Sequence, residues 1–289
     1  MTMRFEKWQA LGNDYLIVER DELPFELTPA RVRRLCEPHF GIFADGVLEL
    51  SRPAQPRHVA DLRIFNPDGS EAELSGNGAR EAILYLRRRG WTDRDEFAIS
   101  TAAGTIRPSV TGPDSCRVDM GRAALSSDDF PGGPPDGRGT VSSAGRNWDF
   151  RHVSIGNPQC AIAVADRGEL ESIDLPATGP AIEGSELFPN RTNVSWYAQL
   201  EPARIRARIF ERGVGETLSS GTGATGAAVA YLQGLAAGAR PASVAVVLDG
   251  GELEVEVGAD LQVHLTGWAR PVFAGALSEE FEKELHETE

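Results

Sequence analysis

Apolar and polar positions alternate along several stretches of the chain, which predicts β-strands. Residues 204–210 alternate as a strand with one buried face does. Residues 250–255 and 261–265 carry a similar pattern on either side of Gly258-Ala259-Asp260. Because that short segment holds residues typical of tight turns, we predict a β-hairpin there.

Two other stretches, 80–89 and 224–235, follow a helical pattern. Each comes directly after a Ser-Gly-x-Gly sequence, and a glycine typical of helix ends follows each one, Gly90 and Gly238. We therefore predict two helices, each opened by a glycine-rich loop.

The segment that leads into each helix is present twice. Residues 63–79 and 208–224 align at a constant offset of 145, and eight of the 17 aligned positions are identical. An earlier pair, Gly12-Asn13, recurs as Gly156-Asn157 at an offset of 144. Each half thus contains strands, a glycine loop that opens one helix, and a hairpin. The chain is predicted to consist of two related lobes.

We place the lobe boundary in the Pro/Gly/Ser-rich segment 124–147, read as a linker or surface excursion. The N-terminal lobe is then 1–123 and the C-terminal lobe 148–289, and the final segment of the second lobe is a candidate to pack back on the first. The charged end, SEEFEKELHETE, is typical of a solvated helix or a frayed terminus.

Charge and composition narrow the possible functions. The 289 residues carry a formal net charge of −14, and the pI is about 4.9. This balance disfavours binding to nucleic acid or to an anionic membrane surface. The chain has no run of 18 apolar residues, and its start lacks the apolar core of a signal peptide, so we expect a cytoplasmic protein.

Cysteine and histidine positions give no metal or redox motif. Cys36, Cys116 and Cys160 are widely spaced and are read as buried apolar side chains in a reducing compartment. The five histidines show no ligand spacing, so no metal site is predicted, and no cofactor is required.

The repeated loop places a serine, Ser75 or Ser220, immediately before each predicted helix. Unpaired backbone N–H groups and the positive end of the helix dipole favour anions at such a position. The simpler interpretation is that each serine only caps its helix. Two copies in two similar halves favour a functional role.

A dinucleotide site is a rival interpretation of the second loop. Residues 221–226 spell GxGxxG, and Asp249 lies beyond them at the end of an apolar run. However, no predicted strand runs directly into this loop, and Glu81 occupies the third glycine position in the first copy. We therefore do not favour a nucleotide.

At this point the motifs show a family resemblance. The chain resembles the diaminopimelate epimerases, which are cofactor-independent amino-acid epimerases. The matching segments follow the family's order along nearly the whole chain: FEKWQALGNDYLIVE, GIFADGVL, FNPDGSEAELSGNGAR, VSIGNPQC, FPNRTNV, ERGVGETLSSGTGA and GGELEVEV. The resemblance implies an α+β fold of two pseudo-symmetric lobes, each a barrel-like mixed sheet around a central helix, with the substrate in the cleft between them.

The resemblance also implies a two-base mechanism, and this sequence departs from it. In the family a cysteine stands before each Gly-x-Gly, and one thiolate removes the α-proton while the other thiol returns a proton to the opposite face. Here Ser75 and Ser220 occupy both positions. The family's histidine after Gly-Asn-Pro is Gln159, and its frequent cysteine after Gly-Ala-Arg is Glu81. Because these two positions changed alongside the serines, natural divergence is favoured over deliberate replacement.

The serine positions raise an energetic problem for that mechanism. An unassisted alcohol lies towards water's pKa of about 15.7. This pKa is at least about five units above that of a thiol, which corresponds to roughly 7 kcal/mol. A helix dipole supplies only about 0.3–2 kcal/mol. A two-serine copy of the thiol mechanism is therefore expected to be very slow.

The resemblance assigns substrate binding to residues that are kept here. Four asparagines stand where the family grips the amino and carboxylate groups, although each alone is equally typical of a turn cap. The two loops retain their backbone donors, and one acid–base pair suits an ammonium and a carboxylate. The expected binding residues are Asn13, Asn66, Asn157, Asn193, Gly76, Asn77, Gly221, Thr222, Glu211 and Arg212.

Three functions remain open. The first is an epimerase acting on diaminopimelate in lysine and peptidoglycan precursor synthesis, with Ser75 and Ser220 as proton carriers. The second is a divergent isomerase or lyase acting on another small acid, with a carboxylate as proton carrier; the candidates are Glu71, Glu73, Glu81 and Glu216, and Glu81 is the first to test. The third is an inactive amino-acid-binding paralogue. All three expect a small amino-acid-like ligand, and the resemblance makes a homodimer plausible.

Overall fold

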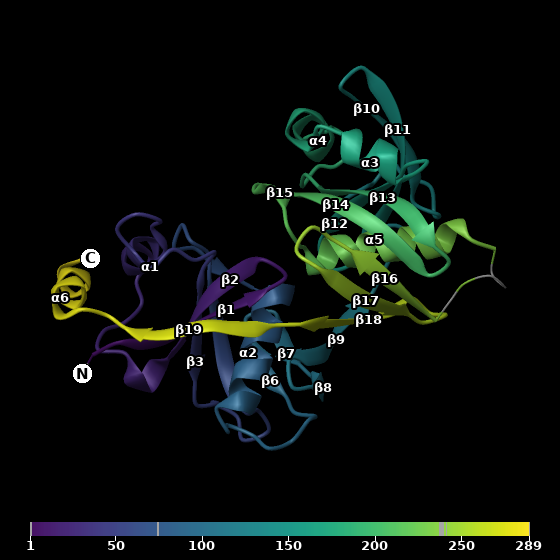
Figure 1. The fold of residues 1–289 in the computed structure, drawn as a ribbon. Helices are drawn as coiled ribbons and strands as arrows, with labels where there is room; N and C mark the ends of the chain where they lie inside the picture. The colour runs from purple at the N-terminus through teal and green to yellow at the C-terminus, as the bar shows by residue number, and fades with distance from the viewer. Residues whose placement is uncertain (1, 74, 237–239, 241, 289) are drawn as a thin grey trace. The chain divides into compact units, whose positions relative to one another are not determined.

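The chain folds into two compact units. The computed structural model describes residues 2–73, 75–236, 240 and 242–288. Unit 1 comprises Met1–Val118 together with Gly267–Glu289, and unit 2 comprises Asp119–Thr266 (Figure 1). The chain passes from unit 1 to unit 2 within β9 (Ser115–Arg122) and returns within β18 (Gln262–Trp268).

Unit 1 is built on a mixed sheet with the strand order β19-β1-β2-β3-β4-β6-β7, in which β5 also pairs with β4. A 13-residue helix, α2, packs against β1, β2 and β3. The bounds are β1 Arg4–Ala10, β2 Asn13–Glu19, β3 Val47–Ser51, β4 Ala60–Phe65, β5 Glu71–Ala72, β6 Ile99–Thr101, β7 Gly104–Ile106, β19 Arg270–Ala276, η1 Arg20–Glu22, α1 Pro29–Cys36, α2 Gly76–Arg88 and α6 Glu279–Glu287.

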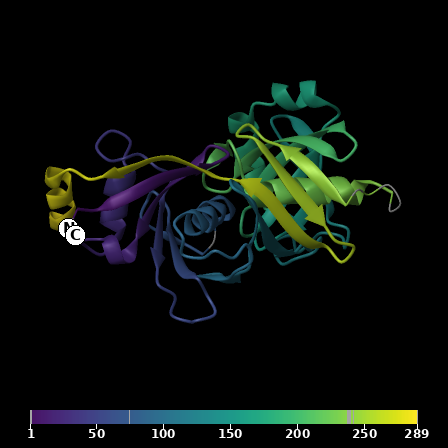
Figure 2. The ribbon, with the colours of Figure 1, turned by 60° about the horizontal axis from the view of Figure 1, so that its bottom comes forward.

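Unit 2 repeats this arrangement around a second buried helix, α5. The second sheet runs β10-β11-β12-β13-β14-β16-β17-β18-β9-β8, in which β15 also pairs with β14; its last strand, β8, belongs to unit 1, and β9 and β18 cross the division. Helix α5 contacts strands on several sides, from β11 through β17 (Figure 2). The bounds are β8 Ser109–Gly112, β10 Arg138–Ser143, β11 Arg146–Ser154, β12 Pro158–Ala163, β13 Asn193–Glu201, β14 Arg204–Glu211, β15 Gly215–Thr217, β16 Ser243–Val247, β17 Glu252–Val257, α3 Arg167–Ser172, α4 Leu175–Glu183 and α5 Gly221–Gly234.

The internal duplication is visible in the strand pairing. The order β1-β2-β3-β4-β6-β7 in unit 1 corresponds to β11-β12-β13-β14-β16-β17 in unit 2. In both series the second strand is parallel to the third, and the fourth is parallel to the next. A short antiparallel strand, β5 or β15, follows the fourth strand and precedes the central helix. The predicted fold of two similar lobes, each a mixed sheet around one helix, is confirmed.

The units divide at a different place from the expected linker. The division falls at 118/119, inside β9. Residues 138–147 of the expected linker contain β10 and the start of β11, which form an antiparallel hairpin. Residues 267–289 belong to unit 1, because β19 pairs along its length with β1. Backbone hydrogen bonding, which the Pro/Gly/Ser-rich composition does not reveal, accounts for this difference.

The predicted local elements agree with the structure. Strand β14 covers the alternating stretch, and β17 pairs with β18 in the expected antiparallel hairpin. Helix α2 ends at Arg88, and Gly90 has a φ of +73° just beyond it. Gly238, the expected end of the second helix, lies outside the described residues, and α5 ends at Gly234.

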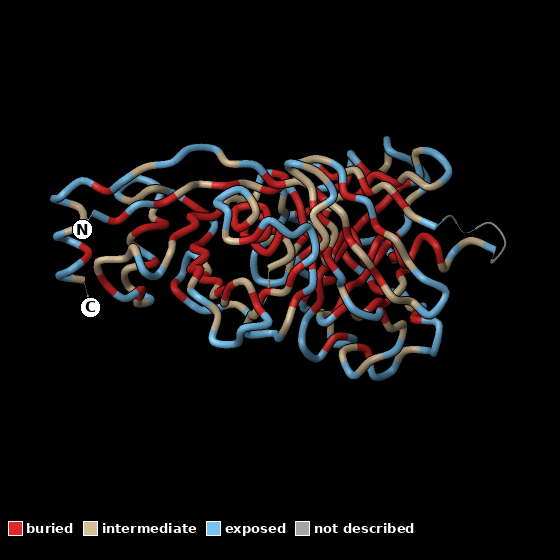
Figure 3. Tube along the Cα trace, turned by 90° about the horizontal axis from the view of Figure 1, so that it is seen from below, coloured by how far each residue is buried: buried red, intermediate tan, exposed pale blue. Residues whose placement is uncertain are grey.

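Both central helices are almost completely buried. Ile83 and Leu86 in α2 and Val229 in α5 have no exposed surface. Figure 3 shows buried positions along the inner strands and helices, with exposed positions at the outer loops. Replacing one such side chain by alanine typically costs about 2–5 kcal/mol, so these cores hold each helix, and the loop that opens it, in a fixed place. Among the described residues, no helix has the length and apolar character needed to cross a membrane.

Candidate active site

Each repeated serine is the N-cap of its central helix. Ser75 has extended backbone angles, and its Oγ accepts a hydrogen bond from the Gly78 backbone N–H at 3.1 Å. Ser220 has nearly the same angles and accepts from the Gly223 N–H at 3.2 Å. Both serines therefore cap their helices, as the simpler interpretation predicted. It also fixes each side-chain oxygen at the positive end of a helix dipole, where an anionic group is stabilised.

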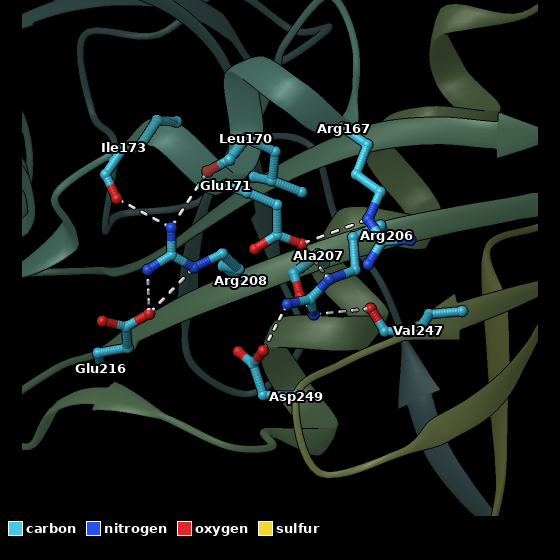
Figure 4. A network of polar contacts seen from close by, with 10 residues as sticks. All are labelled: Arg167, Leu170, Glu171, Ile173, Arg206, Ala207, Arg208, Glu216, Val247 and Asp249. Carbon is cyan, nitrogen blue, oxygen red and sulfur yellow. Dashed lines mark hydrogen bonds and ion pairs between the residues drawn. The ribbon is translucent and has the colours of Figure 1, made fainter.

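The same ion pair supports the approach to each serine. Arg63 of β4 donates two hydrogen bonds of 3.0 Å to Glu71 of β5, and Arg208 of β14 donates to Glu216 near β15. Figure 4 shows the second of these pairs, in which Arg208 also donates to the backbone carbonyls of nearby residues. The hydrogen bond from Arg63 lowers the pKa of Glu71. Glu71 is thus poorly suited to carry a proton, and Glu216 of β15 is paired with arginine in the same way.

The Gly-Asn loop is tied to the start of the central helix in both units. In unit 1, Asn77 Nδ2 donates to Asn13 Oδ1 at 3.1 Å. In unit 2, Asn157 Nδ2 donates to Thr222 Oγ1 at 3.3 Å. We call Asn13, Tyr15, Ser75 and Gly76-Asn77 the first half-site, and Asn157, Gln159, Ser220 and Gly221-Thr222 the second half-site. The structure thus brings together the predicted residues of each loop pair.

The half-sites differ behind the serine. In the first half-site, the Tyr15 hydroxyl donates to Ser75 Oγ at 3.2 Å. The repeat places Gln159 at the position equivalent to Tyr15. Gln159 Nε2 donates to Asn157 Oδ1 at 2.6 Å, and its buried Oε1 has no hydrogen-bond partner among the described residues. Tyr15 is not among the residues predicted from the sequence, although its alignment with Gln159 in the repeat was a signal for it.

A second difference between the two units concerns residue 81 of α2 and its equivalent in α5. Glu81 of α2 is fully buried, and neither carboxylate oxygen makes a hydrogen bond that meets normal geometry with the described residues. Burial raises the pKa of Glu81 well above its ordinary value, and the charges of Asp14 and Asp45 raise it further. The charge of Arg80, which is also fully buried, opposes this shift, and Glu81 is sealed in the core.

In unit 2 the position equivalent to Glu81 is Gly226. A Cβ added at Gly226 would lie 2.8 Å from Gln159 Cβ and 2.9 Å from Gln159 Cγ. Gln159 thus packs directly on the backbone of α5. Unit 1 thus has the larger side chain at both equivalent positions, Tyr15 and Glu81 against Gln159 and Gly226 in unit 2.

The remaining predicted binding residues are hydrogen-bonded within the protein or lie beside the second half-site. Asn66 forms a turn in which its Nδ2 donates to Ser70 Oγ at 3.0 Å. Buried Asn193 donates to the Pro158 carbonyl at 3.1 Å and accepts from the Arg212 backbone N–H at 2.9 Å. Glu211 precedes Arg212 at the end of β14, and Asn193 is paired with Gln159 across the sheet. Asn193, Glu211 and Arg212 are therefore grouped beside the second half-site.

No cysteine replaces the missing thiols. Cys36, Cys116 and Cys160 are all buried. Burial raises the pKa of Cys36 and of Cys116 to about 12, and it raises that of Cys160 well above its ordinary value. The three cysteines therefore supply no thiol to either half-site. The described residues also contain no cluster of three or more histidine, cysteine, aspartate or glutamate side chains able to hold a metal.

Known structures share this two-unit fold. A phenazine biosynthesis protein of the PhzF family from Bacillus anthracis has a TM-score of 0.69 at 17% identity, covering 96% of this chain and 99% of that one. A hydroxyproline epimerase from Agrobacterium vitis has a TM-score of 0.64 at 16% identity, covering 97% and 94%. At such identities the similarity defines the fold class alone.

Sequence relatives define the family. The family model for diaminopimelate epimerase matches residues 5–126 and 151–272. A diaminopimelate epimerase of Synechococcus sp. (strain JA-3-3Ab) is 40% identical over 285 residues, covering 96% of this chain and 99% of the relative. The chain belongs to the diaminopimelate epimerase family. Family and fold together support an amino-acid epimerase, which is an isomerase.

Proposed function

We propose that the protein inverts the α-carbon of an amino acid, with diaminopimelate as substrate and Ser75 and Ser220 as its proton carriers. The observation that carries the proposal is the duplicated serine N-cap. Inversion without a cofactor requires proton removal from one face of the α-carbon and proton return to the other, so it needs two equivalent carriers. The chain supplies two serines in matched half-sites.

Substrate binding is the second part of the proposal. Backbone N–H groups at the start of α2 and α5 would bind the substrate carboxylate and stabilise the negative charge that develops after proton removal. The retained amides Asn13, Asn77 and Asn157 would orient the amino-acid end. Because hydroxyls are weak acids and bases, turnover is expected to be slow.

A single experiment tests the proposal. The purified protein is incubated in D2O with LL-diaminopimelate, meso-diaminopimelate and a panel of other amino acids, and deuterium at the α-carbon is followed by NMR. We expect exchange with diaminopimelate that is lost in Ser75→Ala/Ser220→Ala. Ser278→Ala, which removes the serine N-cap of α6 outside both half-sites, serves as the matched control. Exchange that persists in the double alanine variant would assign the proton transfer to other groups.

An amino-acid-binding protein without catalysis is the second candidate. It is favoured by one observation, the lack of an ionisable side chain at Gln159 behind Ser220. Calorimetric binding of an amino acid that undergoes no exchange in D2O would select this function over the epimerase.

A further inference from the structure

The first half-site contains a group that none of the inferred family roles covers, the hydroxyl of Tyr15. It donates to Ser75 Oγ at 3.2 Å, and Ser75 Oγ also accepts from the Gly78 N–H at 3.1 Å. A serine oxygen that accepts two hydrogen bonds has its own proton left to point elsewhere. Ser75 is half-buried, whereas Tyr15 is only 5% exposed. Tyr15 therefore lies behind Ser75, away from solvent.

We propose that Tyr15 and Ser75 form a two-oxygen proton relay, in which Ser75 touches the substrate and Tyr15 stores the proton. This inference rests on the proposed function, because it describes how that site would move a proton. Tyr15 acts through Ser75 and is in that sense a positioning and proton-storing residue.

The proton balance of the relay is simple. For removal, the pair must first have released one proton to solvent, which leaves Tyr15 as the phenolate; the substrate Cα–H proton then moves to Ser75 Oγ while the Ser75 hydroxyl proton moves to that phenolate. The C–H electron pair stays on the α-carbon and is delocalised into the substrate carboxylate. For return, Tyr15 gives its proton to Ser75 as Ser75 gives its own to the α-carbon. Nothing is oxidised or reduced, and no further reactant is needed.

The chemistry explains why a tyrosine helps. A phenol ordinarily ionises near pH 10, whereas an alcohol lies towards about 15.7. Any charge placed on the pair therefore resides on Tyr15 and not on the serine, which narrows the difference in acidity between this oxygen pair and a thiol. The pKa of a serine hydroxyl alone is more than about five units above that of a thiol.

The second half-site offers no counterpart. Gln159 at the equivalent position has no ionisable proton, and its Nε2 donates to Asn157. Ser220 would then transfer protons with its hydroxyl alone. The relay thus makes the two faces of the substrate unequal.

Other ionisable groups also face this half-site. Lys7 and Asp14 form an ion pair of 3.1 Å, Asp45 accepts from Asn13, and Glu81 lies buried in α2. Arg80 of α2 also donates to Asn77 Oδ1 at 2.5 Å, and burial raises the pKa of Glu81, so a pH profile alone does not identify the phenol. A test that alters only the phenol separates Tyr15 from Lys7.

The experiment measures the exchange rate at the α-carbon of meso-diaminopimelate against pH and substrate concentration. The parent's rate should rise at alkaline pH as the phenol loses its proton. Tyr15→Phe keeps the ring, so we expect it to fold. Its maximal rate should fall about 10²- to 10⁴-fold and no longer rise with pH, with KM nearly unchanged. The matched control Tyr231→Phe, a buried tyrosine of α5, should match the parent. Incorporation of 3-fluorotyrosine at position 15, which acidifies the phenol, should move the alkaline rise to lower pH.

Two results would overturn the relay. One is a Tyr15→Phe variant with the parent's maximal rate and pH profile. The other is a loss confined to KM, which would indicate a packing role alone.

If the parent exchanges no amino acid, the proposed function fails. The titration of the Tyr15 phenol then tests whether Tyr15 and Ser75 share a proton, as the relay requires. The ¹³Cζ signal of Tyr15, assigned with Tyr15→Phe, is followed against pH in the parent and in Ser75→Ala. A higher midpoint in Ser75→Ala supports the shared proton, because the serine hydroxyl no longer donates to the phenolate. An unchanged midpoint overturns it.

Discussion

The two half-sites share one scaffold and differ in what lies behind the serine. In both, an arginine–glutamate pair supports the approaching hairpin, a serine caps the central helix, and an asparagine ties the Gly-Asn loop to the first helical turn. Behind the serine, unit 1 has Tyr15 and Glu81, and unit 2 has Gln159 and Gly226. The duplication has thus preserved the positions of the proton carriers while their acid–base support has diverged.

The largest expected effect comes from restoring a thiol to one half-site at a time. A thiol at position 220 replaces an unassisted alcohol, a difference of more than about five pKa units or roughly 7 kcal/mol. We expect Ser220→Cys to accelerate inversion of diaminopimelate by at least about 10³-fold. Ser75→Cys should gain less than about 10²-fold, because Tyr15 already supports that position. Chiral chromatography measures both rates, and equal gains would contradict the inferred difference between the half-sites.

The next effect concerns the arginines that support the two hairpins. Arg208 donates to the carbonyls of Leu170 and Ile173 as well as to Glu216, and its side chain is 14% exposed against 39% for Arg63. Loss of these charge-assisted bonds should cost Arg208→Gln about 2–3 kcal/mol of unfolding free energy. Arg63→Gln should cost about 1 kcal/mol, because its partner Glu49 keeps Arg20.

Hydrogen exchange resolved by peptide measures the protection of each unit in these two variants. A larger loss in Arg63→Gln than in Arg208→Gln would show that the carbonyl contacts do not contribute as inferred.

A smaller effect tests the packing of Gln159 on α5. The added Cβ in Gly226→Ala meets Gln159 at 2.8 Å, so overpacking should destabilise unit 2 by about 1–3 kcal/mol. Gly234→Ala in the same helix meets nothing within 4 Å and should be neutral or stabilising by up to about 1 kcal/mol. Urea denaturation compares the two variants, and an equally tolerated Gly226→Ala would contradict the close packing.

A pH-dependent effect on stability is expected from Glu81. Because burial raises the pKa of Glu81 in the folded state, the folded protein binds a proton that the unfolded chain releases above about pH 4.3. The parent should therefore lose stability relative to Glu81→Gln as the pH rises, by up to about 1.4 kcal/mol per pH unit, until the folded-state pKa is reached.

Urea midpoints between pH 4 and pH 8 measure this difference, with exposed Glu73→Gln as the control. A difference between parent and Glu81→Gln that does not change with pH would show that Glu81 is charged in the folded protein.

Much of the scaffold was predictable from sequence because it depends on local patterns. Alternation located β14 and the β17–β18 hairpin, and the Ser-Gly-x-Gly repeat located both helix starts. The unit boundary was not predictable in the same way, because it depends on which strand β19 pairs with. Nothing near residue 118 marks that choice.

The differences between the half-sites were harder to foresee. Tyr15 and Ser75 are 60 positions apart, and their contact depends on how β2 packs on α2. Glu81 was a candidate proton carrier by its place near the loop, but the turn of the helix directs its carboxylate into the core. Only the packed structure distinguishes a residue that faces the substrate from one that is sealed behind it.

The stereochemical course of exchange tests the central claim most directly. Each stereoisomer of diaminopimelate is incubated separately in D2O, and deuterium gain in the starting isomer is compared with inversion. If Tyr15 supports only the first half-site, one isomer should gain deuterium with retained configuration much faster than it inverts. If both isomers invert as fast as they exchange, and the recovered starting material contains no deuterium, the half-sites are not unequal in the way inferred.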